Sequence, residues 1–155
     1  YANLELTSIN VEELINKTIA MFPDSRYKIS VIGEIPKTKL NIDITKISLA
    51  LRNLIENALK YGNNKKPVEI HTNIFNTNWI DIHVKDYGLG ISDENIEKIT
   101  NPFFRIKDKN TNKKSGFGMG LSITKKIIEA HKGKLLINSE LNNCTEFIIR
   151  LPINS

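Results

Sequence analysis

The sequence has a single cysteine and no long hydrophobic run. Cys144 has no partner within the chain, so an internal disulfide is impossible and a reducing compartment fits. No stretch approaches the roughly 20 apolar residues that span a bilayer, and the opening residues lack signal-peptide character. The chain starts at Tyr1 instead of methionine, so we expect a piece of a longer protein whose remaining part can be membrane-bound.

Two phosphate-binding motifs and any internal repeat are also missing. Neither the G-x-x-x-x-G-K-[ST] loop nor the G-x-G-x-x-G dinucleotide pattern occurs, so the two commonest phosphate-binding folds are not supported. The length of 155 residues and the 40% hydrophobic and 25% charged composition are typical of one globular domain. We expect a single domain over 1–155, with its core at about 8–152 and residues 1–7 as a linker remnant from a missing upstream domain.

The net charge of +5 suggests an anionic partner, and the positions of the basic residues indicate which kind of partner to expect. Much of the positive charge lies in "KDKNTNKKS" (107–115) and in "NNKKP" (63–67). Neither stretch interleaves aromatic and basic residues as single-strand binders do. We therefore interpret these stretches as solvated loops or as attractors of phosphate, and we expect no nucleic-acid partner.

Hydrophobic periodicity predicts helices alternating with mostly antiparallel strands. This order favours an α/β two-layer sandwich, with a mixed, mostly antiparallel sheet whose one face is covered by helices and whose other face is open. We expect residues 101–118 to be irregular, with a strand pair closing the chain in "KLLINSE" and "TEFIIRL". A long helix is predicted from a cap at Asp43 or Thr45 to Tyr61, with Gly62 as its stop. The other predicted helices cover 8–22, 92–100 and 119–131. The other predicted strands cover 28–32, 39–43, 68–76 and 79–86.

An acidic residue falls on the apolar face of the strand at 79–86. Ile80, Ile82 and Val84 point to one face, and the alternation continues to Asp86. A carboxylate aimed at a core needs a partner, because burying it unpaired is too costly. Two interpretations remain open: Asp86 caps the turn "DYGLG" that follows, or it accepts a hydrogen bond from the exocyclic amine of a base.

The long helix carries a polar stripe beside its apolar one. Asn53 and Asn57 lie one turn apart, and Lys60 and Tyr61 follow on the same stripe. Asparagine is a mediocre helix former, so two of them in a helix interior require a reason. Amide oxygens are hard ligands that suit Mg²⁺, and Lys60 adds a positive charge; the alternative is a merely solvated face.

Three glycines at every second position, Gly116, Gly118 and Gly120, precede the predicted helix at 119–131. Glycine costs conformational entropy on folding, so this spacing indicates either a hinge or a cradle for a ligand that approaches the backbone closely. A cradle at a helix start would offer backbone N–H groups and a positive dipole end to phosphate oxygens.

Four stretches together resemble a known family. "NLIENALKYG", "DYGLGI", "NPFF" and "GFGMGLSI", in this order and spacing, are similar to the nucleotide-binding boxes of the catalytic and ATP-binding domain of sensor histidine kinases, a match that runs over about 8–152. The resemblance implies the Bergerat ATP-binding fold, Mg-ATP as ligand, and donation of the γ-phosphate to a histidine on the dimerisation domain of the same kinase. It further implies a downstream response regulator and a cytoplasmic domain of an inner-membrane-anchored sensor.

The resemblance also assigns roles to individual residues. It implies that Asn57, with Asn53, holds Mg²⁺, that Lys60 and Tyr61 meet the phosphates, and that Asp86 binds the adenine amine. Asn57, Lys60 and Arg105 are the expected catalytic residues, and Phe103 and Phe104 the anchors of a mobile lid. The remaining expected nucleotide contacts are Gly88, Gly90, Ile91, Gly116, Gly118, Met119, Gly120 and Leu121. One departure is Asn101, where the family commonly has an acidic residue before the two phenylalanines.

Two absences separate a kinase from an ATPase. The gyrase-like and chaperone-like relatives place a water-activating glutamate four residues before the metal asparagine, where this chain has Asn53, and Glu56 lies on another face of the helix. None of the three histidines, His71, His83 and His131, is followed by an acidic residue, so we expect the phosphate acceptor on another domain. The alternative is an ATPase or nucleotide-binding module of the same fold without kinase activity.

Overall fold

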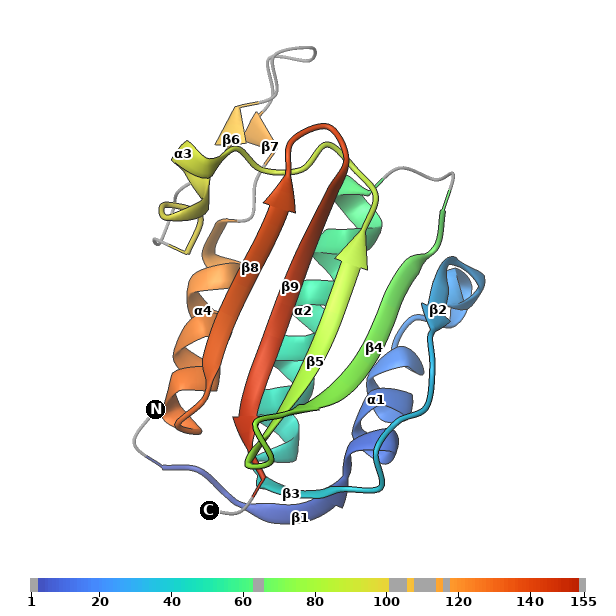
Figure 1. Cartoon of the computed structure of the whole chain (residues 1–155), viewed down its shortest axis with the longest axis vertical. Coiled ribbons are helices and arrows are strands. Elements are labelled where there is room, and N and C mark those ends of the chain that lie inside the picture. The colour runs from blue at the N-terminus through green and yellow to red at the C-terminus, as the bar shows by residue number, and fades with distance from the viewer. Residues whose placement is uncertain (1–2, 63–65, 101–105, 108–113, 116–117, 154–155) are drawn as a thin grey trace.

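The computed structural model of the chain has two layers, a sheet and the helices that cover one of its faces (Figure 1). It describes residues 3–62, 66–100, 106–107, 114–115 and 118–153. The expected α/β two-layer sandwich is confirmed. In chain order the elements are β1 Thr7–Asn10, α1 Val11–Ile19, the 3-10 helix η1 Pro23–Lys28, β2 Ile29–Val31, β3 Lys39–Ile42, α2 Ile44–Tyr61, β4 Val68–Phe75, β5 Trp79–Asp86, α3 Asp93–Ile96, β6 Ile106–Lys107, β7 Lys114–Ser115, α4 Gly118–Ala130, β8 Lys134–Glu140 and β9 Cys144–Pro152.

The main sheet has the strand order β2-β4-β5-β9-β8. Only β2 and β4 run parallel, and the other neighbours are antiparallel, as expected for a mixed sheet. The second face of the sheet, opposite the helices, carries the alternate side chains of each strand. We call this second side the open face.

The core lies between the sheet and α2, α1 and α4. The predicted apolar stripe of α2 is buried, as are Ile80, Ile82 and Val84 of β5. The apolar faces that follow from a period of 3.6 in the helix and of 2 in the strand therefore pack against each other. The stripe consists of Ile47, Leu51, Leu54, Ile55 and Ala58.

Three predicted element boundaries were wrong. The helix predicted over 8–22 is shorter at both ends, because residues 7–10 pair as a strand with β3 and the chain turns into η1 at Pro23. The helix predicted over 92–100 ends at Ile96 and continues as a turn. The segment predicted to be irregular over 101–118 includes the antiparallel pair β6–β7, whose strands of two residues each are too short to show a periodic pattern.

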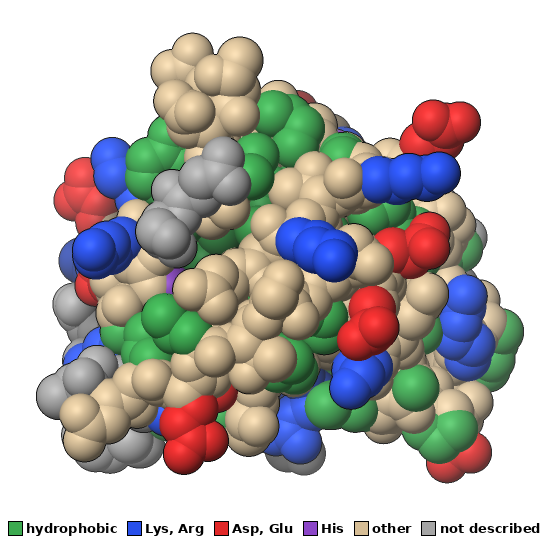
Figure 2. All heavy atoms as spheres, turned by 90° about the horizontal axis from the view of Figure 1, so that it is seen from below, with side chains coloured by type: hydrophobic (Ala, Val, Ile, Leu, Met, Phe, Trp, Pro, Cys, Tyr) green, Lys and Arg blue, Asp and Glu red, His purple; other side chains and the backbone are tan. Residues whose placement is uncertain are grey.

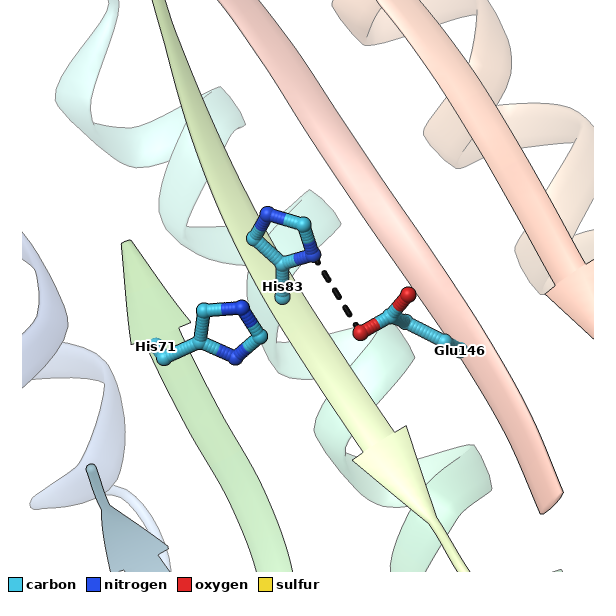
Figure 3. Close-up of side chains that lie close together, drawn as sticks. All are labelled: His71, His83 and Glu146. Atoms are coloured by element: carbon cyan, nitrogen blue, oxygen red, sulfur yellow. Dashed lines mark ion pairs between the residues drawn. The ribbon is translucent and has the colours of Figure 1, made fainter. Parts of the chain in front are cut away.

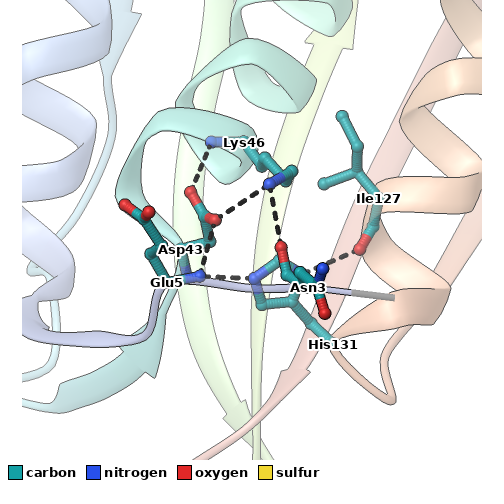
Figure 4. Close-up of polar contacts among 6 residues, drawn as sticks. All are labelled: Asn3, Glu5, Asp43, Lys46, Ile127 and His131. Atoms are coloured by element: carbon teal, nitrogen blue, oxygen red, sulfur yellow. Dashed lines mark hydrogen bonds and ion pairs between the residues drawn. The ribbon is translucent and has the colours of Figure 1, made fainter. Parts of the chain in front are cut away.

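A cluster of polar groups fixes the start of α2 (Figure 4). Asp43 is the N-cap: its carboxylate accepts hydrogen bonds from the Lys46 backbone at 3.1 Å and from the Glu5 backbone at 3.0 Å, and it pairs with the Lys46 ammonium at 3.2 Å. The Asp43 N–H donates to Nε2 of His131 at 3.0 Å, and Nδ1–H of His131 donates to the Ile127 carbonyl at 2.8 Å. The cluster thus joins α2, α4 and the N-terminal segment.

The charge of Asp43 contributes to stability through these contacts. Burial raises the pKa of the carboxyl, but the hydrogen bonds from Glu5 and Lys46 outweigh it and leave the pKa below its ordinary value of 3.8. A depressed pKa in the folded state means that the stabilisation is present above the unfolded pKa and is lost as the pH falls through the folded one.

On the end of the molecule where β1 and β3 lie, basic and acidic side chains are interspersed (Figure 2). The excess positive charge therefore does not gather on this surface. Within the described part of the chain, no helix combines the length and apolar character needed to cross a membrane.

Asp43→Ala is expected to lower the free energy of unfolding by about 0.5–2 kcal/mol at pH 7, the usual effect of losing an N-cap. Urea unfolding at a series of pH values measures it, and the difference from the unmodified chain should shrink only below about pH 4, where the carboxyl protonates. Thr45→Ala is the matched control, because Thr45 was the other candidate cap and is exposed. An equal loss in both variants would contradict the cap assignment.

Candidate functional site

The predicted site residues that the structure describes gather at one end of the molecule. The C-terminal ends of α2 and β5 and the N-terminal end of α4 lie together at the end where α3 is also found (Figure 1). These are the elements that carry the first, second and fourth sequence boxes. The fold therefore brings together motifs that lie far apart in the sequence.

Asp86 is the last residue of β5 and lies on the helix-covered face of the sheet. Its side chain is only 4% exposed, and Oδ1 accepts a hydrogen bond from the Gly88 N–H at 2.9 Å. Burial raises the pKa of this carboxyl to about 6, although the Gly88 hydrogen bond lowers it. The turn-capping interpretation is thus confirmed, but one N–H uses only one of the several lone pairs of a carboxylate. The Asp86 carboxylate can therefore accept a further hydrogen bond from a second donor.

Two glycines allow Asp86 to pack against the end of α2. A Cβ atom on Gly88 would lie 2.2 Å from the Tyr61 carbonyl oxygen, and a Cβ atom on Gly62 would lie 2.6 Å from the Ala58 carbonyl oxygen and 3.1 Å from Cβ of Asp86. The predicted stop at Gly62 is confirmed, but its φ of −72° is ordinary. The glycine is required there by close contact and not by a left-handed backbone.

The loop after Asp86 is held by the turn between β8 and β9. Gly90 has a φ of +71°, and a Cβ atom there would lie 2.2 Å from the Glu140 carbonyl oxygen. The Ile91 N–H donates to Oγ of Ser139 at 2.6 Å, and Oγ–H of Ser139 donates to the Cys144 carbonyl at 3.0 Å. Ile91 itself is buried. The "DYGLGI" box is therefore a fixed wall of the site.

The polar stripe of α2 lies beside α4. Nδ2 of Asn53 donates to Oγ1 of Thr124 at 3.4 Å, so its amide oxygen is the atom left to accept or to ligate. Asn57 is half-buried one turn further on. Lys60 is exposed, and its ammonium lies 5.3 Å from the centre of the half-buried Tyr61 ring. The stripe is thus partly enclosed and is not a uniformly solvated face.

Glu56 points to a different part of the surface. It lines a shallow groove together with Phe22, Arg52 and the predicted site residue Lys60, on the side of α2 where η1 lies. Asn53, by contrast, contacts α4. Glu56 therefore cannot take the place of a glutamate at position 53.

The N-terminal turn of α4 contains Gly120, and no contact with the described residues requires a glycine at this position. A Cβ atom on Gly120 would meet no described heavy atom within 4 Å apart from its chain neighbours and its own helix backbone. The next residue, Leu121, is fully buried in the core. Helical glycine costs about 0.5–1 kcal/mol relative to alanine, so the free space at Gly120 suits either a ligand or a moving backbone.

Several predicted residues cannot be placed. Phe103, Phe104, Arg105 and Gly116 lie outside the described residues, so the lid prediction stays a prediction. Gly118 and Met119 form the first turn of α4. The predicted roles of all site residues remain expectations at this point.

Sequence reasoning missed three hydroxyl residues around the site. Thr145 is the direct cross-strand partner of Asp86 and is buried, Thr124 contacts Asn53, and Ser139 holds Ile91. For Thr145 a signal existed: it shares the apolar face of its strand with Phe147, as Asp86 does with Val84. Thr124 and Ser139 could be found only from the packing of distant elements.

The family profile described as histidine kinase-, DNA gyrase B- and HSP90-like ATPase matches residues 42–155. Among relatives, the sensor protein RprX of Bacteroides fragilis is 34% identical over 98% of this chain, and the sensor protein kinase WalK of Staphylococcus aureus is 35% identical over 97%. The chain spans 30% and 36% of the lengths of these two proteins.

Solved structures of the histidine kinase ThkA are also similar. Its nucleotide-free catalytic domain is 29% identical, with a TM-score of 0.78 over 97% of this chain and 99% of that one. A structure of ThkA in complex with the response regulator TrrA gives 29% identity and a TM-score of 0.78, over 97% of this chain and 42% of that one. By its profile match and its fold, the chain belongs to the family of histidine kinase-, DNA gyrase B- and HSP90-like ATPases.

Proposed function

We propose that this chain binds Mg-ATP between the ends of α2, β5 and α4 and donates the γ-phosphate to a histidine on the dimerisation domain of a sensor histidine kinase. The observation that carries the proposal is Asp86, a carboxylate enclosed at a strand end and held against the helix that bears Asn53 and Asn57. A buried carboxylate with unused lone pairs suits a fixed donor such as an adenine amine.

Asp86 would select adenine over guanine. Adenine offers an amine at the position where guanine offers a carbonyl, and a carboxylate cannot accept from a carbonyl. Thr145, buried directly opposite Asp86, adds a hydroxyl to the same wall. The fixed loop from Gly88 to Ile91 would limit the space for the base.

The residues of α2 fit a magnesium ion. Amide oxygens are hard donors, and the Asn53 nitrogen is directed at Thr124, which leaves its oxygen as the ligating atom. Asn57, with Asn53, would hold the ion, which when bound neutralises phosphate charge. Lys60 and Tyr61 would bind and orient the phosphate chain, and the free space beside Gly120 would admit a phosphate to the positive end of α4.

The chain supplies the donor half of the reaction. Its His131 is 7% exposed and both ring nitrogens are hydrogen-bonded, while His71 and His83 lie on the open face, away from Asp86. None of them is placed to receive a phosphoryl group from this site. Positioning and charge stabilisation suffice for phosphoryl transfer, so no base within the chain is required.

Hydrolysis of ATP as the main activity has less support. Position 53 holds an amide bonded to Thr124, and Glu56 faces the groove near η1. No carboxylate of α2 therefore lies where a water-activating base would stand. An ATPase or a nucleotide-binding module remains the second candidate only because the family includes such proteins.

The wider context follows from the relatives. RprX and WalK are sensor proteins of about three times this length, and ThkA has been solved with a response regulator. We extend the proposal to a cytoplasmic kinase domain within a membrane-anchored sensor that passes phosphate to a response regulator.

Asp86→Asn is expected to weaken ATP binding at pH 7 by about 10- to 150-fold, equivalent to about 1.5–3 kcal/mol for a hydrogen bond to a charged group. Isothermal titration calorimetry measures it, and Asp93→Asn is the control because it removes an exposed carboxylate seven positions away. Equal affinity of the Asp86 variant and the unmodified chain would remove Asp86 from the site.

The same variant has an expected pH signature. Because the folded pKa is raised from 3.8 to about 6, ionised Asp86 costs stability, and the cost grows as the pH rises from about 4 to 6. Asp86→Asn should therefore be the more stable protein at pH 7 but not at pH 4. Adenosine, which has no phosphate to titrate, should bind the unmodified chain less tightly below pH 6. A variant less stable at pH 7 would show that turn capping is the main role.

Gly120→Ala is expected to raise the free energy of unfolding by up to about 1 kcal/mol and yet weaken ATP binding. The added methyl group meets no described protein atom but would occupy the space assigned to the nucleotide. Thermal unfolding and calorimetry on the same sample give both values. Gly133→Ala serves as the contrast, because a Cβ atom there would lie 2.3 Å from the Arg150 carbonyl oxygen and should destabilise the fold. Unchanged ATP affinity in Gly120→Ala would contradict the cradle.

Labelled ATP should leave this chain unlabelled but label the protein's own dimerisation domain when that domain is added separately. Acid-labile, alkali-stable label identifies phosphohistidine. Asn57→Ala should abolish the transfer, whereas Glu56→Gln should not, because Glu56 lines the groove near η1 and not the side of α2 where Asn53 contacts α4. Label on His71, His83 or His131 would contradict the donor-half proposal, and brisk phosphate release that Glu56→Gln stops would favour the ATPase alternative.

A further inference from the structure

A cluster of two histidines and a glutamate lies on the open face of the sheet, on three neighbouring strands (Figure 3). His71 of β4 and His83 of β5 are direct cross-strand partners, and Glu146 of β9 lies diagonally beyond His83. One potential ligand atom from each residue lies within 4.8 Å of the other two. The strands fix this spacing, because all three side chains rise from paired positions of one sheet.

The hydrogen bonds of His83 determine which ring nitrogen is available. Nε2 lies 2.6 Å from Oδ1 of Asn73, and an amide oxygen can only accept, so Nε2 carries the proton. Nδ1 is buried and makes no hydrogen bond, although Oε2 of Glu146 lies 3.3 Å away. In neutral His83 two electron-rich atoms therefore face each other, and this arrangement favours a cation between them.

His71 supplies the third donor. Its ring stacks on that of His83, with centroids 3.9 Å apart and an interplanar angle of 12°. Burial and the neighbouring His83 lower the pKa of His71. A neutral imidazole is the form that ligates metals.

We propose that His71, His83 and Glu146 form a binding site for a divalent transition metal of the Zn²⁺ type. Two imidazoles and one carboxylate suit zinc, copper or nickel, whereas Mg²⁺ prefers oxygen ligands and would not compete here. Asn73 has the role of an outer partner, because it fixes the tautomer and orientation of the His83 ring. The site is separate from the nucleotide site, since its side chains occupy the opposite face of the sheet from Asp86.

Binding requires a small rearrangement of side chains and none of the backbone. Ligand atoms around a tetrahedral zinc ion are about 3.4 Å apart, for metal–ligand distances of about 2.0–2.2 Å. The 4.8 Å spread must therefore contract, and the His71 ring must turn out of the stack so that its lone pair points at the ion. Lys85 and Glu69, which flank the cluster on the same face, offset each other in charge.

Calorimetric titration of the chain with ZnCl₂ at pH 7, without nucleotide, tests the proposal. One ion per chain is expected, and Glu146→Gln and His71→Gln should each weaken binding by more than about 10-fold, because losing a direct ligand costs at least as much as losing an outer partner. Glu69→Gln is the matched control: Glu69 and Glu146 are the two cross-strand partners of Lys85, so both variants remove one charge from the same row. Cys144→Ser tests whether the thiol of Cys144, two residues before Glu146, contributes to zinc binding.

Histidine side-chain NMR of the unmodified chain gives a second measurement that needs no variant to fold. Zn²⁺ should shift the ring signals of His71 and His83 and leave those of the buried His131 unchanged, whereas Mg²⁺ should shift none of them. Zinc binding that survives both ligand variants, that is lost with Cys144→Ser, or that leaves the His71 and His83 signals unmoved would overturn the proposal.

Discussion

The close contact between Gly88 and the last turn of α2 is the constraint on which the site depends. A Cβ atom on Gly88 would lie 2.2 Å from the Tyr61 carbonyl oxygen and 2.9 Å from Cα of Gly62, and a Cβ atom on Gly62 would lie 3.1 Å from Cβ of Asp86. Any Cβ at Gly88 would push the turn after β5 away from α2, because 2.2 Å is far below van der Waals separation. Glycine at positions 62 and 88 thus allows the boxes "NLIENALKYG" and "DYGLGI" to pack against each other as one wall of the site.

This contact also explains why a carboxylate can remain buried at that position. Asp86 has a single backbone hydrogen bond from Gly88, which is too little to offset its burial, and its pKa rises to about 6. A group that is under-satisfied in the free protein is ready to accept a further donor, since binding then relieves a cost already present in the fold. Asp43 shows the contrast: it too is little exposed, but it lies nearer the surface, and the hydrogen bonds from Glu5 and Lys46 lower its pKa, so its role is structural.

The two faces of the sheet are used differently. The helix-covered face holds the core and, at its end, the nucleotide site, whereas the open face presents polar pairs. One of them, Arg150 with the buried Asp81, joins β9 to β5 through two hydrogen bonds of 2.8 and 2.9 Å. The His71–His83–Glu146 cluster lies on this same face, so two chemically distinct sites can occupy one domain without sharing a residue.

The sequence by itself determined the element types and most of their bounds, because α2, β4 and β5 have long and regular hydrophobic periods. It also indicated Asp86, since a carboxylate on an apolar strand face is visible in the alternation alone. It did not separate Asp43 from Thr45 as the cap of α2. It placed residues 8–10 in a helix, because their pairing with β3 is a contact about 30 positions away. Only the tertiary structure decided that Thr124 contacts Asn53, that Ser139 holds Ile91 and that three side chains from β4, β5 and β9 converge. Their contacts depend on register and helix packing across distant segments, which no local pattern encodes.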